Sequence, residues 1–350
     1  MKNADQLRVS SSGSRLSLDA HGGDHGLDVT VPGALDALRA DPLLEIVLVG
    51  QGEAIESALS GRSNGLDSRL SVVDAPDVLA ADAKPTAVLR RGRKSSLWLA
   101  MDQVAKGEAD ACVSGGSTAA LMTAGVTLIG LLPGIARPAL MAYVPNPLGH
   151  VAMLDLGANL DVDADQLVQF AIMGAVTLEV ADRIEKPRVA LLNVGHEDSK
   201  GHTTVRAAHD KLKQLPINYV GFIEGNDLFS DKADVAVCDG FAGNLVLKSS
   251  EGLARMLTGE FRKALEASMI SRLGAMLAGR SIRRTLAPLD PSAHNGAPLL
   301  GLKAVVMKSH GSANQKAMTR AILEAGREAR RRVPEKIEAS IRAFQTEFEA

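Results

Sequence analysis

The sequence of 350 residues has little cysteine and no excess of charge of either sign. Its two cysteines, Cys112 and Cys238, each lie in an apolar run, which excludes a disulfide framework and a cysteine metal cage. This cysteine usage predicts a reducing compartment. The net charge of −2 comes from interspersed signs, so no global basic field is available to hold nucleic acid or an anionic membrane. Any anion site must therefore be local.

The chain also lacks an unbroken apolar segment of membrane-spanning length. The uncharged stretch 111–136 opens with a Ser/Gly cluster and closes with Pro133-Gly134, which predicts a strand, a turn and a buried helix of about 15 residues. Residues 1–14 lack the apolar core of a signal peptide and are predicted to be a disordered lead-in. We therefore expect a cytoplasmic protein.

Several catalytic motifs are missing. No G-x-G-x-x-G follows a strand in the required context, no Walker motif is present, and no G-x-S-x-G elbow occurs. Neither cysteine has the electropositive surroundings of a nucleophile. Asp19, Asp24, Asp155, Asp161 and Asp239 could gather around Mg²⁺, but helix caps and turns explain most of them. We expect no metal, no cofactor and no acylated side chain.

What the chain does have is a series of short Val/Leu/Ile runs that alternate with helical patterns. Near-continuous apolar runs of this kind are typical of parallel strands covered on both faces. They predict an α/β fold, a doubly wound, Rossmann-like three-layer αβα sandwich. Most runs end in Gly, Ser, Asp or Asn, so we expect a ligand site at one carboxyl edge of the sheet. The runs are 15–19, 45–50, 70–76, 110–116, 151–157, 187–195, 218–225, 234–240 and 302–311.

Three helical segments frame the predicted α/β domain of residues 15–330. Asp163, followed three residues later by Gln166, predicts a capping box at the start of a helix over 163–184. Residues 249–286 are helical and amphipathic, with apolar residues toward a tip, and should protrude as a hairpin or pair with another surface. Residues 331–350 are predicted to form a charged C-terminal helix and tail.

Glycine-rich strand ends that precede helices supply backbone N–H groups for a phosphate. Such turns occur at 22–23, 114–118, 240–244 and 310–312. In the second of them, Ser117 or Thr118 could cap a helix and also present a hydroxyl to a ligand, and a pure capping role is the alternative. Cationic side chains lie beside these and similar turns, namely Lys200, Lys248, and Lys308 with His310.

Taken together, these segments resemble the PlsX-type phosphate acyltransferases of bacterial phospholipid synthesis. The likeness rests on "DAHGGD", "GEADACVSGGSTAALM", "ALLNVGHEDSKGH", "KADVAVCDGFAGNLVLKSSEG" and "NGAPLLGLKAVVMKSHGSAN", which follow in the family's order over roughly residues 16–327. The sequence departs from the family pattern at His21, Ser117, Ala119 and Ala242. The resemblance implies an isocitrate/isopropylmalate dehydrogenase-like fold.

The resemblance implies transfer of a fatty acyl group from acyl carrier protein to inorganic phosphate, giving acyl phosphate and free carrier protein. Phosphate is itself the nucleophile, so the enzyme needs only to bind the anion and stabilise an oxyanion. By position in the matched motifs, Lys200 and Asn244 are expected to contact phosphate or the oxyanion, and His310 to protonate the departing thiolate. The other candidate substrate- and phosphate-binding residues are Asp19, Gly22, Gly23, Asp24, Ser114, Gly116, Ser117, Thr118, Lys248 and Ser309.

Among these, we expect the glycine pair to let backbone approach the substrate and Asp24 to orient a cation. The resemblance further implies a homodimer built by the helical hairpin, with weak membrane contact at a tip containing Met269, Ile270, Leu273, Met276 and Leu277. A plain dimer core is an alternative role for that tip. A membrane glycerol-3-phosphate acyltransferase is the implied downstream partner.

The sequence leaves two other functions possible. A decarboxylating dehydrogenase would share the fold, but it needs clustered arginines and a Tyr-Lys pair, and Tyr143 and Tyr219 are the only tyrosines. A catalytically divergent sensor that binds acyl carrier protein or phosphate is suggested by the departures at His21 and Ser117.

Overall fold

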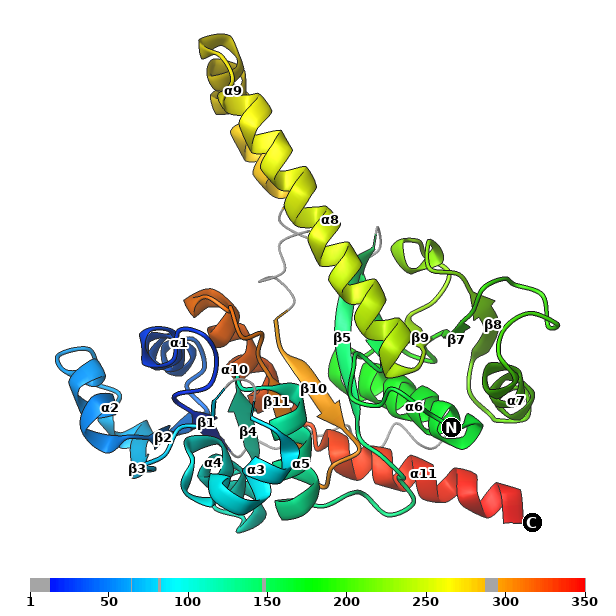
Figure 1. Ribbon diagram of the computed structural model, residues 1–350, viewed down its shortest axis with the longest axis horizontal. Helices are drawn as coiled ribbons and strands as arrows, with labels where there is room; N and C mark the ends of the chain where they lie inside the picture. Colours follow the sequence, from blue (N-terminus) through cyan, green and yellow to red (C-terminus); the bar gives the residue numbers. More distant parts are fainter. Residues whose placement is uncertain (1–12, 64, 81–82, 147–148, 287–294, 350) are drawn as a thin grey trace, which may run out of the picture.

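One large mixed sheet, flanked by helices, forms the body of the protein (Figure 1). The computed structural model describes residues 13–63, 65–80, 83–146, 149–286 and 295–349. Within them, eleven strands pair in the order β3-β2-β1-β4-β11-β10-β5-β6-β9-β7-β8. The strands are β1 Ser14–Asp19, β2 Leu44–Gly50, β3 Leu70–Asp74, β4 Ala111–Ser114, β5 Ala139–Asn146, β6 Gly149–Leu154, β7 Val189–Leu192, β8 Tyr219–Ile223, β9 Val235–Val237, β10 Ala297–Leu300 and β11 Val305–Lys308.

All nine predicted apolar runs form strands, whereas β5 and β10 were not predicted. These two strands decide the topology, because β10 is antiparallel to both β11 and β5, and β5 is antiparallel to β6. β1 to β4 and β11 are parallel to one another, and β6 to β9 are parallel among themselves but run the opposite way. The expectation of a parallel sheet with one carboxyl edge is therefore wrong, since the two halves end at opposite edges.

Helices cover both faces of the first half of the sheet because its strands carry apolar side chains on both faces. Leu16, Leu48 and Met307 point toward α1 and α10, whereas Val47, Cys112 and Val306 point toward α4 and α5. The helices of this half are α1 Leu27–Ala40, α2 Gly52–Leu59, α3 Pro85–Arg91, α4 Ser96–Ala105, α5 Thr118–Leu128 and α10 Gln315–Arg330.

In the second half, α6 (Ala164–Thr177), α7 (Thr203–Leu212) and α11 (Val333–Glu349) share one core with the strands. The predicted capping box is confirmed, since Asp163 and Gln166 exchange hydrogen bonds at the start of α6. Of the predicted C-terminal segment 331–350, α11 packs on α6 through buried Val333, Ile337 and Ile341. Of the predicted lead-in 1–14, residues 1–12 lie outside the described residues.

Two helices project from the body as one long arm (Figure 1). α8 (Gly240–Glu266) leaves the end of β9, and α9 (Met269–Leu286) folds back beside it. Most of their apolar side chains are exposed, because none of the described residues covers the outer half of the pair. In the part of the chain that the structure describes, no helix is long and apolar enough to cross a membrane.

Candidate active site

A cavity of about 890 Å³ lies between the two halves of the molecule. Turns that follow β1, β4 and β11 form one wall, the β5 face forms the floor, and α8 forms the opposite wall. The volume falls in the range of small-molecule sites, about 300–1,000 Å³. Of the candidates from sequence, the structure brings ten to this cavity: Asp19, Gly22, Gly23, Asp24, Gly116, Ser117, Thr118, Asn244, Lys248 and His310.

The Gly22-Gly23 pair after β1 is needed because the backbones of neighbouring turns pack too closely for a side chain. A Cβ atom on Gly22 would lie 2.9 Å from the amide nitrogen of Gly115, and one on Gly115 would lie 2.8 Å from the Gly22 carbonyl oxygen. Gly23 has a φ of +96°, which favours glycine. The Asp24 amide also donates to the Gly311 carbonyl at 2.8 Å. The three turns thus form one rigid wall.

Buried polar side chains support this wall from behind. The Ser114 hydroxyl donates to Asp19 Oδ2 at 2.6 Å, and burial raises the pKa of the Asp19 carboxyl. Asn295 donates to Ser309 Oγ at 2.8 Å, and its Oδ1 accepts from the His310 amide at 2.9 Å. Neither Ser114 nor Ser309 lines the cavity, so these hydroxyls hold neighbouring groups in place.

The start of α5 faces the cavity with its backbone amides. Ser117 Oγ accepts from the Ala120 amide at 3.2 Å, which makes Ser117 the N-cap and settles the choice between capping by Ser117 and by Thr118. Gly116 and Thr118 lie beside it in the cavity wall. Because a helix N-terminus carries partial positive charge, this end of the cavity favours an anion.

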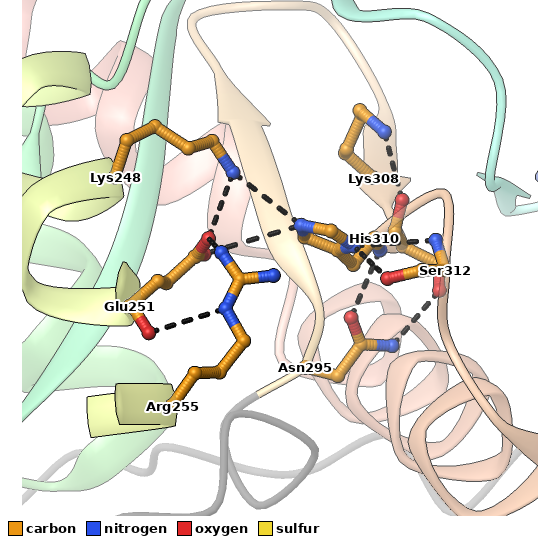
Figure 2. Close-up of polar contacts among 8 residues, drawn as sticks. Lys248, Glu251, Arg255, Asn295, Lys308, His310 and Ser312 are labelled. Carbon is orange, nitrogen blue, oxygen red and sulfur yellow. Dashed lines mark hydrogen bonds and ion pairs between the residues drawn. The ribbon is translucent and has the colours of Figure 1, made fainter. Parts of the chain in front are cut away.

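A cationic cluster lies where α8 meets the turn after β11, and Figure 2 shows its side chains. Lys248 Nζ lies 3.0 Å from Glu251 Oε2 and 3.4 Å from His310 Nε2. Glu251 Oε1 lies 3.9 Å from His310 Nε2, and Arg255 Nη2 lies 4.0 Å from Glu251 Oε2. One carboxylate on α8 therefore gathers Lys248, His310 and Arg255.

The hydrogen bonds of His310 indicate which ring nitrogen carries the proton. The Ser312 amide donates to His310 Nδ1 at 3.2 Å, so Nδ1 is an acceptor and the neutral ring bears its proton on Nε2. Burial, followed by the charge of Lys248, lowers the pKa of the His310 imidazole. In this tautomer the Nε2–H group and the Lys248 ammonium, whose nitrogens lie 3.4 Å apart, are both donors, so they can share an anionic acceptor but do not hydrogen-bond to each other.

Lys308 is the most deeply buried cation of the site. Its Nζ donates to the Ser309 carbonyl at 2.8 Å. Burial, with a smaller contribution from Lys248, lowers the pKa of the Lys308 ammonium to about 8, and Asp24 opposes this shift. Asp24 thus acts electrostatically on both Lys308 and His310 and opposes the lowering of each pKa.

No role was predicted for Glu251, Arg255 or Asn295, and Lys308 was predicted only as a cation beside a glycine turn. A signal for two of them was available, because Glu251 and Arg255 follow Lys248 by three and seven residues and so share its face of α8. A signal for Lys308 was its position at the end of an apolar run. Asn295 opens the matched segment "NGAPLLGLKAVVMKSHGSAN", but no local pattern indicated its role.

Asn244 reaches the cavity from the first turns of α8, which lie against the turn after β6. A Cβ on Gly243 would overlap the Asp155 carbonyl, and one on Gly157 would lie 3.4 Å from Asn244 Cβ. Lys200 lies instead on the turn after β7, at the other edge of the sheet, and does not line this cavity. The structure therefore does not bring Lys200 and His310 together within one chain.

Four of the remaining candidates for covalent or metal chemistry are buried thiols or carboxylates that hold backbone groups. Burial raises the pKa of the thiols of Cys112 and Cys238. Asp155 accepts hydrogen bonds from Leu140 and Asn159, and Asp239 caps α8. Across the described ranges, no group of three or more His, Cys, Asp or Glu side chains is placed to hold a metal ion.

Comparison with known proteins now assigns the family. Residues 14–336 match the family model for fatty acid synthesis proteins. The chain belongs to this family. A phosphate acyltransferase of Shewanella amazonensis is 48% identical over 92% of this chain and 95% of its own length. Another, from Alkalilimnicola ehrlichii, is 44% identical over 94% and 96%. The resemblance seen in the sequence and the expectation of an acyltransferase are thereby confirmed.

Solved structures agree with the fold of this family member. A phosphotransacetylase from Streptococcus pyogenes matches with a TM-score of 0.61 at 19% identity, over 92% of this chain and 96% of that chain. A 4-hydroxythreonine-4-phosphate dehydrogenase from Burkholderia phymatum matches with a TM-score of 0.53 at 14% identity, over 91% and 99%. The fold is thus shared by phosphotransacylases and by a dehydrogenase.

Proposed function

We propose that this family member transfers a fatty acyl group from acyl carrier protein to inorganic phosphate, giving acyl phosphate and free carrier protein. The observation that carries the proposal is the cavity in which the α5 N-terminus and three cationic side chains, Lys248, Arg255 and Lys308, converge on one small space. A dianionic nucleophile needs this environment, and the acyltransferase relatives support the reaction class.

Phosphate would bind between the α5 amides and Lys248, and one of its oxygens would attack the thioester carbonyl carbon. The C–O bond forms as the carbonyl π electrons move to oxygen. When the tetrahedral intermediate collapses, the C–S bond breaks and the thiolate leaves with its electron pair. The thiolate then takes up a proton, and the proton of the hydrogen phosphate balances the reaction. The enzyme therefore needs a proton carrier beside the sulfur.

Lys308 suits the role of proton carrier better than His310 does. With a pKa of about 8, the Lys308 ammonium is close in acidity to a thiol, whose ordinary pKa is about 8.5. His310 is neutral at pH 7 and carries its proton on Nε2, so it fits the role of a hydrogen-bond donor to the oxyanion. Asn244 would supply a second donor from the α8 side.

If Lys200 contacts phosphate or the oxyanion, it does so in the cavity of a second copy of the chain. It lies at the carboxyl end of β7, away from the cavity of its own chain. Lys200→Ala would then lower kcat/KM only if the copies associate. If the dimeric Lys200→Ala variant loses as much kcat/KM as Asn244→Ala does, the result would support a Lys200 side chain contributed by a second copy.

We further propose a homodimer and peripheral membrane contact, which match the exposed apolar surfaces of the helical arm. An apolar stripe follows α8 with helical spacing and suits a second copy: Phe241, Leu245, Leu253, Met256, Leu257 and Phe261. The tip carries Met269, Ile270 and Met276, which are 86%, 85% and 78% exposed and suit a lipid surface. The protein would work in the cytoplasm beside the membrane glycerol-3-phosphate acyltransferase that uses its product. The fold would be a doubly wound three-layer αβα sandwich whose central strands, β10 and β5, are antiparallel to their neighbours.

A single assay tests the function against the sensor alternative. The pure protein is incubated with acyl carrier protein thioester, with and without phosphate, and acyl phosphate is trapped as the hydroxamate. Thioester loss that depends on phosphate and yields hydroxamate is expected. Tight binding of the thioester without turnover would favour the sensor, and thioester breakdown indifferent to phosphate would overturn the proposed reaction.

A further inference from the structure

We propose that the β5 side of the cavity holds the fatty acyl chain of the thioester, with Ala142 beside its path. This inference rests on the proposed function and deepens it, because it assigns the part of the cavity that the phosphate chemistry leaves unused. We call this part the acyl arm. It is formed by Leu140, Ala142, Val144, Leu156, Phe229 and Leu247.

The acyl arm is built from one face of β5. Because side chains alternate along a strand, Leu140, Ala142 and Val144 point to the same side, and all three line the cavity. The Leu156 amide donates to the Leu140 carbonyl at 3.1 Å, which places Leu156 at the end of this row. Leu247 covers the row from α8. None of these side chains carries a polar atom.

Strand register connects the acyl arm to the cationic site. β10 pairs Ala297 with Lys308 on one side and Leu299 with Leu140 on the other. If the β5–β10 register is continued by two residues, Ala142 falls level with Ala297 and Lys308, at about 10 Å from Lys308 across two strand spacings. A thioester carbonyl held beside Lys308 can therefore direct its acyl chain onto Ala142 and onward to Leu140 and Leu156.

The acyl chain fits this surface better than the pantetheine arm of the carrier does. Pantetheine carries amide and hydroxyl groups, which would lose their hydrogen bonds to water against purely apolar side chains. A hydrocarbon chain binds more tightly through the same contact. Each buried methylene contributes about 0.8 kcal/mol, which corresponds to about a fourfold gain in affinity. Phe229 is 46% exposed although it lines the cavity, so the gain should level off where the acyl arm opens.

The test compares kcat/KM for butanoyl, octanoyl, dodecanoyl and hexadecanoyl carrier thioesters at saturating phosphate. In the wild type, kcat/KM should rise with chain length and then level off. Ala142→Leu fills the arm with three more carbon atoms and should lower the hexadecanoyl-to-butanoyl ratio about tenfold or more. Ala254→Leu is the matched control, because Ala254 lines the cavity from α8 beyond Glu251 and should leave the ratio unchanged.

The outcomes separate this inference from the proposed function. Butanoyl turnover by Ala142→Leu shows that the variant is folded, and Ala142→Val replaces it if the larger side chain is not accepted. An unchanged length ratio in a variant that turns over butanoyl thioester would overturn the acyl arm. An equal loss at every length with a raised KM for carrier would also overturn it, in favour of pantetheine. Failure of the wild type to form acyl phosphate from any thioester would instead remove the proposed function.

Discussion

Replacing Lys308 by methionine should make the protein more stable at neutral pH and less active. Folding buries the Lys308 ammonium and lowers its pKa from 10.5 to about 8. At pH 7 the group is still charged in the folded state, so folding bears the cost of burying that charge. A pKa difference of this size corresponds to a cost on the order of 3 kcal/mol. Methionine keeps the volume of the stem and removes the charge.

The pH dependence gives the sign of the effect. Between pH 8 and 10.5 the unfolded chain binds the Lys308 proton and the folded chain does not, so this group makes stability rise with pH. The destabilising contribution is complete below pH 8 and disappears above 10.5. The difference in free energy of unfolding between Lys308→Met and the wild type should therefore be largest at pH 7 and should shrink as pH rises from 8 to 10.5.

Urea denaturation of both proteins at several values between pH 7 and pH 10.5 measures the difference, and Lys303→Met is the control at an exposed lysine. The same variant should lose kcat/KM by about 10²-fold or more if Lys308 carries the proton to the thiolate. In the wild type, kcat/KM should fall as pH rises through about 8, and the variant should lack this step. Lower stability of Lys308→Met at pH 7, or a difference that does not change with pH, would refute the reasoning.

Three other predictions concern the α8 wall of the site and the tip of the helical arm. Asn244→Ala should cost about 3 kcal/mol of transition-state stabilisation if Asn244 donates to the oxyanion, and a folded variant with wild-type kcat/KM would exclude that role. Glu251→Gln releases Lys248 and should raise the KM for phosphate or lower kcat by roughly tenfold, with little change in melting temperature, because the Lys248 side chain is 49% exposed and water weakens the pair. Leu273→Asp should abolish flotation with anionic liposomes, whereas equal flotation of variant and wild type would rule out apolar anchoring at the tip.

Local patterns in the sequence determined most of the elements and much of the wall of the site. Nine apolar runs predicted nine strands, the Asp163 capping box predicted the start of α6, and the glycine turns predicted a wall rich in backbone amides. These features depend on neighbours within a few residues, so they can be read along the chain. The family motifs added the acyltransferase reaction, which the relatives support.

Only the tertiary structure decided which of those residues share a cavity. β5 and β10 carry no clear strand signal, yet their antiparallel pairing reverses the second half of the sheet and sends Lys200 to the opposite edge from His310. Burial, which depends on segments far apart in the sequence, separates Lys308 from the solvated lysines and lowers its pKa. Strand direction and desolvation are properties of the whole fold, and for that reason the sequence by itself could name the cations but not say which of them act together.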